Sequence, residues 1–269
     1  MGSTVAQGPD EPGLELVDVS KTFGGLTAVS SASLTLRPGT VHGLIGPNGA
    51  GKSTLIGIAS GFIKPSSGQV RLAGRDISTL DPTRVAQLGL ARTFQQATPI
   101  TGLTVLENVM VGMHLHYRSG IAAVLFRTPS MRREAREREA AARSMLENFE
   151  LGADADTDAA DLPFGKLRFL EIARAVVMQP RLLLLDEPAA GLNAIETERL
   201  AAIIRVQAAQ GTGILLVDHD VPFVFSLCDH VTVMNFGSVI ASGKPDDVYR
   251  DAAVREAYLG DETAEETAA

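Results

Sequence analysis

The sequence has little cysteine, no excess of basic residues and no long apolar run. Cys228 is the only cysteine among 269 residues, which excludes an intrachain disulfide and suits a reducing compartment. We expect it to be a small buried apolar side chain. Lys and Arg number 24 against 32 Asp and Glu, so the net charge is −8. This balance argues against a nucleic-acid partner, because nucleic-acid binders usually present a basic face.

The apolar runs are too short to cross a membrane. A spanning helix needs about 18 or more consecutive apolar residues, and the runs in this chain fall far short of that length. The first residues, MGSTVAQGPDEPG, lack the apolar segment of a secretory signal. If the protein serves a membrane, we expect it to act from one side.

Strand and helix patterns alternate along most of the chain. The runs 182–185 and 214–217 are continuously apolar, as expected for strands covered on both faces of a mostly parallel sheet. The alternation predicts an α/β fold with additional strands near the N-terminus. The expected strands are Leu14–Val17, Leu34–Leu36, Val41–Ile45, Val70–Leu72, Leu182–Leu185, Ile214–Val217 and Val231–Asn235. The expected helices cover 52–60, 82–88, 104–115, 131–150, 166–178, 195–210 and 221–227.

The domain organisation follows from composition. Residues 1–13 and 259–269 are rich in small, acidic and Gly/Pro residues, so we expect flexible tails around a single domain over 14–258. Residues 98–165 lack convincing strands and contain a charged helical stretch with i,i+4 pairs, which indicates an inserted helical lobe. The predicted core then covers 14–97 and 166–258.

The lobe begins with an apolar segment. Thr104 and Glu107 have the spacing of a capping box, which predicts a helix start. The apolar residues could pack the lobe or form a surface that receives a partner helix, and we expect some to do each. Ile121–Phe126 could be a second exposed patch or a buried turn. The apolar residues of the first segment are Leu103, Val105, Leu106, Val109, Met110 and Met113.

A glycine-rich segment matches the pattern G-x-x-x-x-G-K-[ST]. It follows the apolar strand Val41–Ile45 and opens a helix, which is the context that the motif requires. Its glycines let backbone N–H groups surround phosphates, and the helix N-terminus adds partial positive charge. Lys52 would reach the β- and γ-phosphates, and the Ser53 hydroxyl would ligate Mg²⁺. The predicted nucleotide-binding residues here are Gly46, Pro47, Asn48, Gly49, Ala50, Gly51, Lys52, Ser53 and Thr54.

Two carboxylates follow the apolar strand Leu182–Leu185. Strand ends of a parallel sheet face its ligand-binding edge, so Asp186 would hold Mg²⁺ through a water molecule, and Glu187 would act as general base toward the attacking water. Alone, adjacent carboxylates could also form a solvated turn, but the phosphate-binding motif in the same chain favours a site.

A histidine and a glutamine are further candidates. His219 follows the buried strand 214–217, where it could hydrogen-bond a γ-phosphate, although an isolated histidine there is more often structural. Gln95 could touch Mg²⁺ or the attacking water, and spacing alone supports this weakly. The histidines without supporting context, to which we assign no metal, are His42, His114, His116 and His230.

The order of these motifs resembles the ATP-binding cassette (ABC) ATPase family over about residues 14–258. The resemblance implies a P-loop NTPase fold with a mostly parallel core sheet, an N-terminal antiparallel β subdomain and an inserted helical subdomain. Asp186 and Glu187 look like the metal ligand and catalytic carboxylate, Gln95 like the Q-loop glutamine and His219 like the switch histidine. The remaining matches are Phe23, which would stack on adenine, and the D-loop residues Gly191, Leu192 and Asn193, where many members carry Asp at the last position.

The family signature is altered in this chain. Members usually have Leu-Ser-Gly-Gly-Gln, which closes the ATP of a partner cassette, whereas here Pro163, Phe164, Gly165 and Lys166 follow Leu162. Proline has neither a hydroxyl nor an N–H, but it suits the first turn of a helix. What remains is one glycine, the helix N-terminus and the charge of Lys166. We therefore predict a reduced anion-binding half-site and a heterodimer with two unequal ATP sites.

A helical pattern follows the signature. Arg168, Glu171 and Arg174 are expected mostly off its buried face. The residues expected on that face are Phe169, Leu170, Ala173, Val176 and Val177.

Finer features resemble the ATPase subunits of branched-chain amino acid importers, and the enlarged lobe resembles the longer of that system's two ATPases. The resemblance implies an ATP- and Mg²⁺-dependent ATPase at the cytoplasmic face of the bacterial inner membrane. Its implied partners are a second ATPase subunit, two membrane permease subunits and an extracytoplasmic solute-binding protein. Alternatives are an importer of urea or short amides, a lipopolysaccharide-type exporter, a soluble cassette protein or a subunit that does not hydrolyse ATP. The matching segments are 23–29, 44–48, 91–95 and 170–174.

Overall fold

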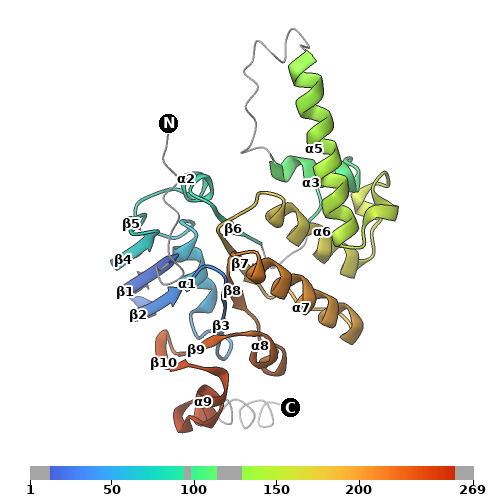
Figure 1. The fold of residues 1–269 in the computed structure, drawn as a ribbon. Helices are drawn as coiled ribbons and strands as arrows, with labels where there is room; N and C mark the ends of the chain where they lie inside the picture. The colour runs from blue at the N-terminus through green and yellow to red at the C-terminus, as the bar shows by residue number, and fades with distance from the viewer. Residues whose placement is uncertain (1–12, 94–97, 114–128, 258–269) are drawn as a thin grey trace. The chain divides into compact units, whose positions relative to one another are not determined.

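The computed structural model describes residues 13–93, 98–113 and 129–257. They form two compact units. Figure 1 shows the chain coloured by residue number, from blue at the N-terminus to red at the C-terminus. The first unit gathers the described residues of Met1–Arg92, Arg181–Ala190 and Ala201–Ala269, and the second those of Thr93–Pro180 and Gly191–Leu200. The predicted domain boundaries stay a prediction.

A six-stranded sheet forms the centre of the first unit. Its strand order is β10-β9-β3-β8-β7-β6, parallel except for β10, which runs antiparallel to β9. Every residue of β7 and β8 is buried, which confirms the prediction from their continuously apolar runs. The strands are β3 (Val41–Ile45), β6 (Leu90–Arg92), β7 (Leu182–Asp186), β8 (Gly213–Val217), β9 (His230–Asn235) and β10 (Ser238–Gly243).

An antiparallel sheet of order β2-β1-β4-β5 belongs to the same unit. Its strands β1 and β2 are much longer than predicted, because they continue as an exposed hairpin to Phe23 and Leu26. Gly24 and Gly25, both with positive φ, make the turn of that hairpin. The strands are β1 (Leu14–Phe23), β2 (Leu26–Leu36), β4 (Ser67–Leu72) and β5 (Arg75–Asp76).

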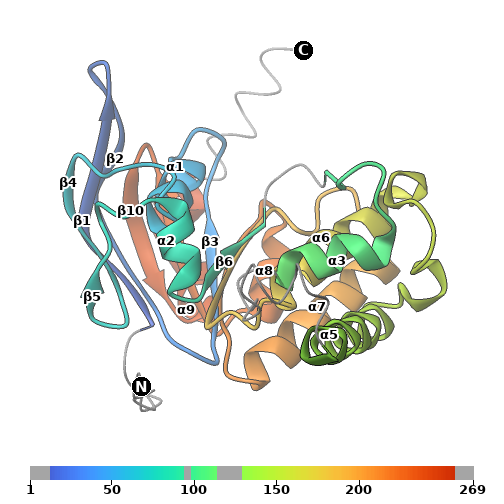
Figure 2. The ribbon, with the colours of Figure 1, turned by 90° about the horizontal axis from the view of Figure 1, so that it is seen from above.

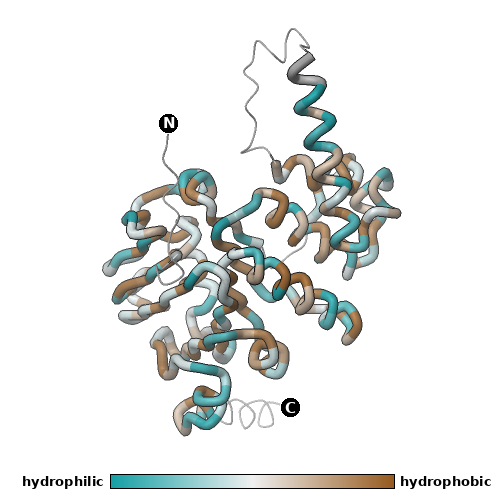
Figure 3. Tube along the Cα trace, viewed as in Figure 1, coloured by the Kyte–Doolittle hydropathy of each residue, from teal (hydrophilic) through white to brown (hydrophobic). Residues whose placement is uncertain are grey.

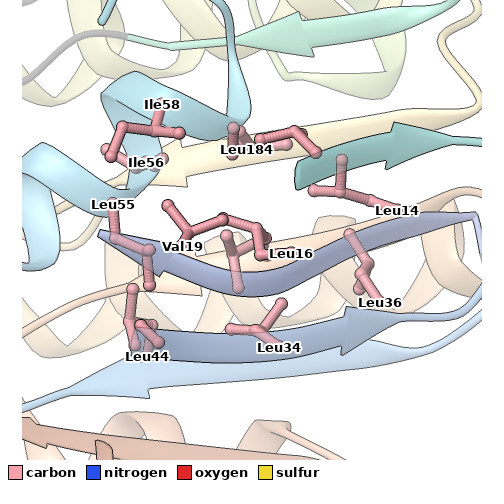
Figure 4. Packing of buried hydrophobic residues seen from close by; sticks show 14 of the residues in the cluster. Leu14, Leu16, Val19, Leu34, Leu36, Leu44, Leu55, Ile56, Ile58 and Leu184 are labelled. Carbon is pink, nitrogen blue, oxygen red and sulfur yellow. The ribbon is translucent and has the colours of Figure 1, made fainter. Parts of the chain in front are cut away.

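The helix α1 (Lys52–Ala59) connects the two sheets through a common hydrophobic core. Its Leu55, Ile56 and Ile58 pack in one cluster with side chains of β1, β2 and β7, as Figure 4 shows from close by, and side chains of β8 belong to the same cluster. On the other sheet face, an added Cβ on Gly43 of β3 would meet Val224 of α8 (Val221–Leu227), so that helix covers β3 closely. Two shorter helices of this unit are α2 (Pro82–Gln87) and α9 (Pro245–Arg250).

The second unit is helical. Its helices α3 (Val105–Gly112), α5 (Pro129–Asn148) and α6 (Phe164–Val176) contact one another, as Figure 2 shows. Short 3₁₀ turns, η2 (Gly152–Asp154) and η3 (Ala159–Asp161), lie between α5 and α6, and the helix α7 (Ala194–Ala209) begins in this unit. The predicted capping box is confirmed, since the side chains of Thr104 and Glu107 exchange hydrogen bonds with each other's backbone.

The polar helix α5 has the predicted i,i+4 charge pairs, and much of it is teal in Figure 3. The pairs are Arg133–Glu137, Arg138–Glu134 and Arg143–Glu139.

The apolar segment of α3 divides as expected. Val105, Leu106 and Val109 are buried, whereas Leu103, Met110 and Met113 stay partly exposed. Docking of a partner helix on them stays a prediction, and Ile121–Phe126 lies outside the described residues. In the described part of the chain, no helix combines the length and apolarity that a membrane crossing needs.

Helix α6 corrects one expectation. Its predicted apolar face is buried, but Arg168, expected off that face, is only 2% exposed. The guanidinium donates to Glu171 Oε2 at 3.1 Å and lies 5.7 Å from the ring centre of Phe164. Periodicity treats a charged residue as solvated, whereas here an ion pair compensates its burial.

Candidate functional site

The glycine-rich loop joins β3 to α1. Gly51 is the N-cap of α1 with φ 101°, and a Cβ added there would approach the carbonyl oxygen of Ala28 to 2.5 Å. A side chain at this position would therefore disturb the loop. Asn48, Gly49 and Ser53 are exposed, so this edge of the loop is open to a ligand.

Lys52 folds back over this loop. Its Nζ donates to the carbonyl oxygens of Gly46 and Pro47 at 2.6 and 3.0 Å, and the residue is 7% exposed. Burial lowers the Lys52 pKa, while the carboxylates of Glu187 and Asp186 act in the opposite direction. The structure therefore brings together the lysine and the two carboxylates that the sequence singled out.

The two carboxylates lie where β7 ends. Asp186 is 6% exposed and pairs with Arg92 of β6, Nη2 to Oδ2 at 3.0 Å. Glu187 is partly buried, has φ 48°, and donates its backbone N–H to the carbonyl of Val217 at 2.7 Å. A non-glycine residue in this left-handed region costs about 1–3 kcal/mol, and such strain concentrates at functional sites.

Asp218, which the sequence analysis did not single out, organises the adjacent strand end. It is 0% exposed and accepts hydrogen bonds from the backbone N–H groups of Ala189, His219 and Asp220 at 3.2, 2.8 and 3.0 Å. Burial raises its pKa, and these bonds act in the opposite direction. Asp218 thus ties the turn after Glu187 to the end of β8. The sequence does contain a signal that could have identified Asp218, because it is an acidic residue directly after a buried strand.

His219 follows at the same strand end. Its side chain is 64% exposed, and its Nδ1 lies 3.6 Å from Asp218 Oδ1. The exposed imidazole is accessible to a ligand, and its role as a phosphate contact stays a prediction. Gln95 lies outside the described residues, so its role also stays a prediction.

Phe23 ends β1 on the exposed hairpin. It is 47% exposed, and Lys21 Nζ lies 4.9 Å from its ring centre. The ring therefore has an accessible face on which a base could stack.

The altered signature begins α6 in the second unit. The helix starts at Phe164, two residues before the predicted start at Lys166, with Pro163 as N-cap and no side-chain cap. Lys166 Nζ lies 2.6 Å from Asp154 Oδ2, so the charge predicted to remain at this helix end is paired. The predicted D-loop contacts the signature, since a Cβ on Gly191 would approach Phe164 to 2.6 Å.

The other two D-loop residues differ in role. Asn193 caps α7 by exchanging hydrogen bonds with Glu196, each at 3.0 Å. Leu192 is partly buried.

Two histidines that lacked context in the sequence have clear partners. His42, in β3, contacts the Thr35 carbonyl with Nδ1 at 3.1 Å and the Thr232 hydroxyl with Nε2 at 2.8 Å. Burial, followed by the neighbouring His230, lowers the His42 pKa to about 4. The pair belongs to the packing of β3 and β9, and His42 lies four positions before Gly46, where the loop begins. His114 and His116 lie outside the described residues.

Known proteins resemble this chain over nearly its whole length. A profile of the family described as ABC transporter matches residues 29–190, and one described as branched-chain amino acid ATP-binding cassette transporter matches residues 238–264. The chain is 40% identical over 251 residues to the high-affinity branched-chain amino acid transport ATP-binding protein BraF of Pseudomonas aeruginosa, covering 93% of this chain and 98% of that protein. It is 39% identical over 252 residues to LivG of Escherichia coli, with coverage of 93% and 99%.

A solved structure is similar as well. The ADP conformation of MJ1267, an ATP-binding cassette of an ABC transporter, superposes with a TM-score of 0.79 at 30% identity, covering 93% of this chain and 99% of that one. The predicted fold class is thereby confirmed.

Proposed function

The chain belongs to the ABC transporter ATPase family, and we propose that it powers the import of branched-chain amino acids by hydrolysing ATP. The observation that carries the proposal is the near-full-length similarity to two branched-chain amino acid transport ATP-binding proteins. The match at residues 238–264, which begins with β10 and includes α9, supports the same assignment.

In the proposed site the nucleotide lies along the first unit. Adenine stacks on the exposed ring of Phe23, and the phosphates approach the backbone N–H groups between Gly46 and Thr54 at the N-terminus of α1. Lys52 exchanges its contacts with the carbonyls of Gly46 and Pro47 for β- and γ-phosphate oxygens. Its ammonium is already held at the loop, so little ordering is required.

The residues fit a magnesium ion that is shared with the nucleotide. The Ser53 hydroxyl and the Asp186 carboxylate are oxygen donors, which Mg²⁺ prefers. Within the described ranges, no group of three His, Cys, Asp or Glu residues could hold a metal, so phosphate oxygens would complete the coordination. Gln95 is proposed as a further ligand. When bound, Mg²⁺ neutralises charge on the β- and γ-phosphates.

Hydrolysis is proposed to use Glu187 and His219. Glu187 orients a water and accepts its proton as the water oxygen attacks the γ-phosphorus, and the bond to the bridging oxygen of ADP breaks. His219 donates a hydrogen bond to the γ-phosphate. Asp218 positions His219 through its backbone N–H, and it holds the turn after Glu187 through the N–H of Ala189. The products are ADP and phosphate.

The proposed assembly requires partners. A second ATPase subunit would supply the signature that closes this chain's ATP, while Pro163, Phe164, Gly165 and Lys166 would face the partner's ATP beside the D-loop. Two permease subunits and an extracytoplasmic solute-binding protein would complete the importer. The chain would act as a peripheral subunit at the cytoplasmic face of the bacterial inner membrane.

Uptake in a deletion strain tests the transported solute. Labelled leucine, urea and a control sugar are offered to cells without the gene, to cells with the wild-type gene and to cells with Lys52→Ala. We expect leucine uptake to be lost, restored by the wild type and not restored by the variant, while sugar uptake stays constant. Unchanged leucine uptake with loss of urea uptake would replace the proposal by the urea alternative.

A further inference from the structure

The guanidinium of Arg92 lies on the carboxylate proposed to serve Mg²⁺. Arg92 Nη2 and Asp186 Oδ2 are 3.0 Å apart, and the two side chains are 12% and 8% exposed. Arg92 Nη1 also donates to Ser60 Oγ at 3.0 Å, and its guanidinium carbon lies 5.6 Å from the ring centre of Phe62. Three contacts therefore fix the guanidinium between the end of β7 and the residues that follow α1.

Strand register explains how the arginine reaches this carboxylate. Arg92, the last residue of β6, is paired with Leu184 of β7. Leu184 and Asp186 lie on the same face of β7, about 7 Å apart along the strand. A long side chain beside Leu184 can span that distance. The planar guanidinium can also bond Asp186 and Ser60 simultaneously, a geometry that a lysine ammonium reproduces poorly.

We propose that Arg92 is the countercharge of Asp186 in the nucleotide-free protein and that Mg²⁺ replaces it when the metal–nucleotide complex binds. A buried carboxylate without a partner is strongly unfavourable, so the empty site needs a cation beside Asp186. The guanidinium beside Oδ2 and a Mg²⁺ ion at the same carboxylate would repel each other strongly at this distance. Arg92 is thus a positioning residue that competes with the metal, and the inference rests on the role proposed for Asp186.

The ammonium of Lys52 is held at the glycine-rich loop. The carboxylates are near enough to counteract the effect of burial on its pKa, but its Nζ is hydrogen-bonded to the carbonyls of Gly46 and Pro47. The short cationic contact of Asp186 comes from Arg92. The loop lysine therefore remains available for phosphate while the arginine holds the metal ligand.

Magnesium titration of the full-length protein tests the exchange. A fluorescent ADP derivative is held at fixed concentration, and Mg²⁺ is added to wild type, Arg92→Met and the control Arg84→Met, whose guanidinium contacts the Gln87 side chain on α2. We expect Arg92→Met to lower the Mg²⁺ concentration at half-maximal binding roughly tenfold, the size of one charged hydrogen bond. The control should match the wild type. An equal or higher midpoint in Arg92→Met would overturn the proposal.

Thermal unfolding supplies a second measurement. In EDTA without nucleotide, Arg92→Met should lower Tm, and adding Asp186→Asn should restore most of it, because the unpaired charge is then removed. With saturating Mg²⁺ and ADP, Arg92→Met should lower Tm only slightly. An equally large decrease in Tm under both conditions would show that Arg92 stays paired with Asp186 when the metal is bound, which would contradict the proposed exchange.

Two further results keep the outcomes separate. If Arg92→Met does not fold, Ser60→Ala removes one of the three contacts, and its Mg²⁺ midpoint should fall several-fold. A midpoint at or above the wild-type value would overturn the exchange. If wild-type protein binds no ADP derivative at all, the proposed function fails, independently of Arg92.

Discussion

Two helices of this protein begin at proposed phosphate sites, and their first turns are built differently. Neither helix has an acidic residue in its own first turn, but α1 follows Gly51 and carries Lys52 folded over the loop. Helix α6 follows Pro163, and its Lys166 is paired with Asp154. Both helix N-termini carry partial positive charge. The neighbouring side chains determine how strongly this partial charge can stabilise a bound anion.

The second helix start already has a negative charge beside it. A Cβ added to Gly165 would collide with the Glu196 carboxylate, so this group lies next to the first turn of α6. The ring of Phe164 covers Gly191 on the same side. Helix α1 therefore presents an open, cationic phosphate site, whereas α6 presents a partly neutralised one.

Replacing the proposed base should have the largest effect. Glu187→Gln should lower steady-state ATP turnover about a thousandfold, because general-base catalysis contributes roughly 10²–10⁴-fold. ATP affinity should stay unchanged, since the phosphate contacts remain. Phosphate release by the assembled transporter and nucleotide titration measure the two quantities. Turnover equal to that of the wild type would remove Glu187 from this role.

Replacing each of the two lysines by alanine tests whether the two helix starts differ in their contribution to ATP binding. Lys52→Ala should weaken ATP binding by at least about 100-fold, because it removes contacts worth roughly 1.5–3 kcal/mol each. Lys166→Ala, the matched control at the other helix, should leave the affinity of this chain's own ATP unchanged. Fluorescent-ATP titration of both variants checks this, and similar losses would mean that the sites are not distinct.

The glycine requirement of the first loop is the next test. Gly51→Ala should destabilise the protein by about 2 kcal/mol, because φ is 101° and the new Cβ would meet Ala28. Gly49 also has positive φ, but nothing lies within 4 Å of a Cβ added there. Gly49→Ala should therefore lower the free energy of unfolding by only about 1 kcal/mol. Urea unfolding of both variants measures the difference. A Gly49→Ala loss as large as that of Gly51→Ala would contradict the close approach to Ala28.

The carboxylate beside α6 should have the smallest effect. Glu196→Gln removes its charge while the amide oxygen can still accept from the Asn193 N–H, so ATP-dependent dimerisation should strengthen about threefold, the size of a helix-dipole contribution. Exposed Glu198, on the same helix, provides the control Glu198→Gln. Sedimentation at low and high salt measures both. No difference between the two variants would exclude an effect of Glu196.

The same comparison explains what the sequence could predict. The segment from Gly46 to Ser53 is contiguous, and its strand–loop–helix context is local, so the sequence alone predicted its position between β3 and α1. The pairs Lys166–Asp154 and Arg92–Asp186 join residues far apart in the chain, and no local pattern encodes them. Their partners arise only from strand register and helix packing.

Burial of charge was missed for a related reason. Asp218 and Arg168 are almost fully buried, yet both are charged residues that periodicity places in solvent. The tip of the hairpin of β1 and β2 was also missed, because Phe23 and Leu26 are exposed there and no buried face imposes a pattern on them. The six-residue strand β10, mostly half-buried, was missed similarly.

Restoring the usual signature residues is the most direct test of whether α6 presents a reduced anion-binding half-site. In the Glu187→Gln background, which should retain ATP and stabilise the dimer, Pro163→Ser, Phe164→Gly and Lys166→Gln are introduced together. Sedimentation with ATP and the second ATPase subunit then compares the affinity of the heterodimer, and titration compares the ATP affinity of this chain alone. The account predicts a tighter ATP-dependent dimer with unchanged monomer affinity for ATP. Equal dimer affinity before and after the repair would contradict a reduced half-site at α6.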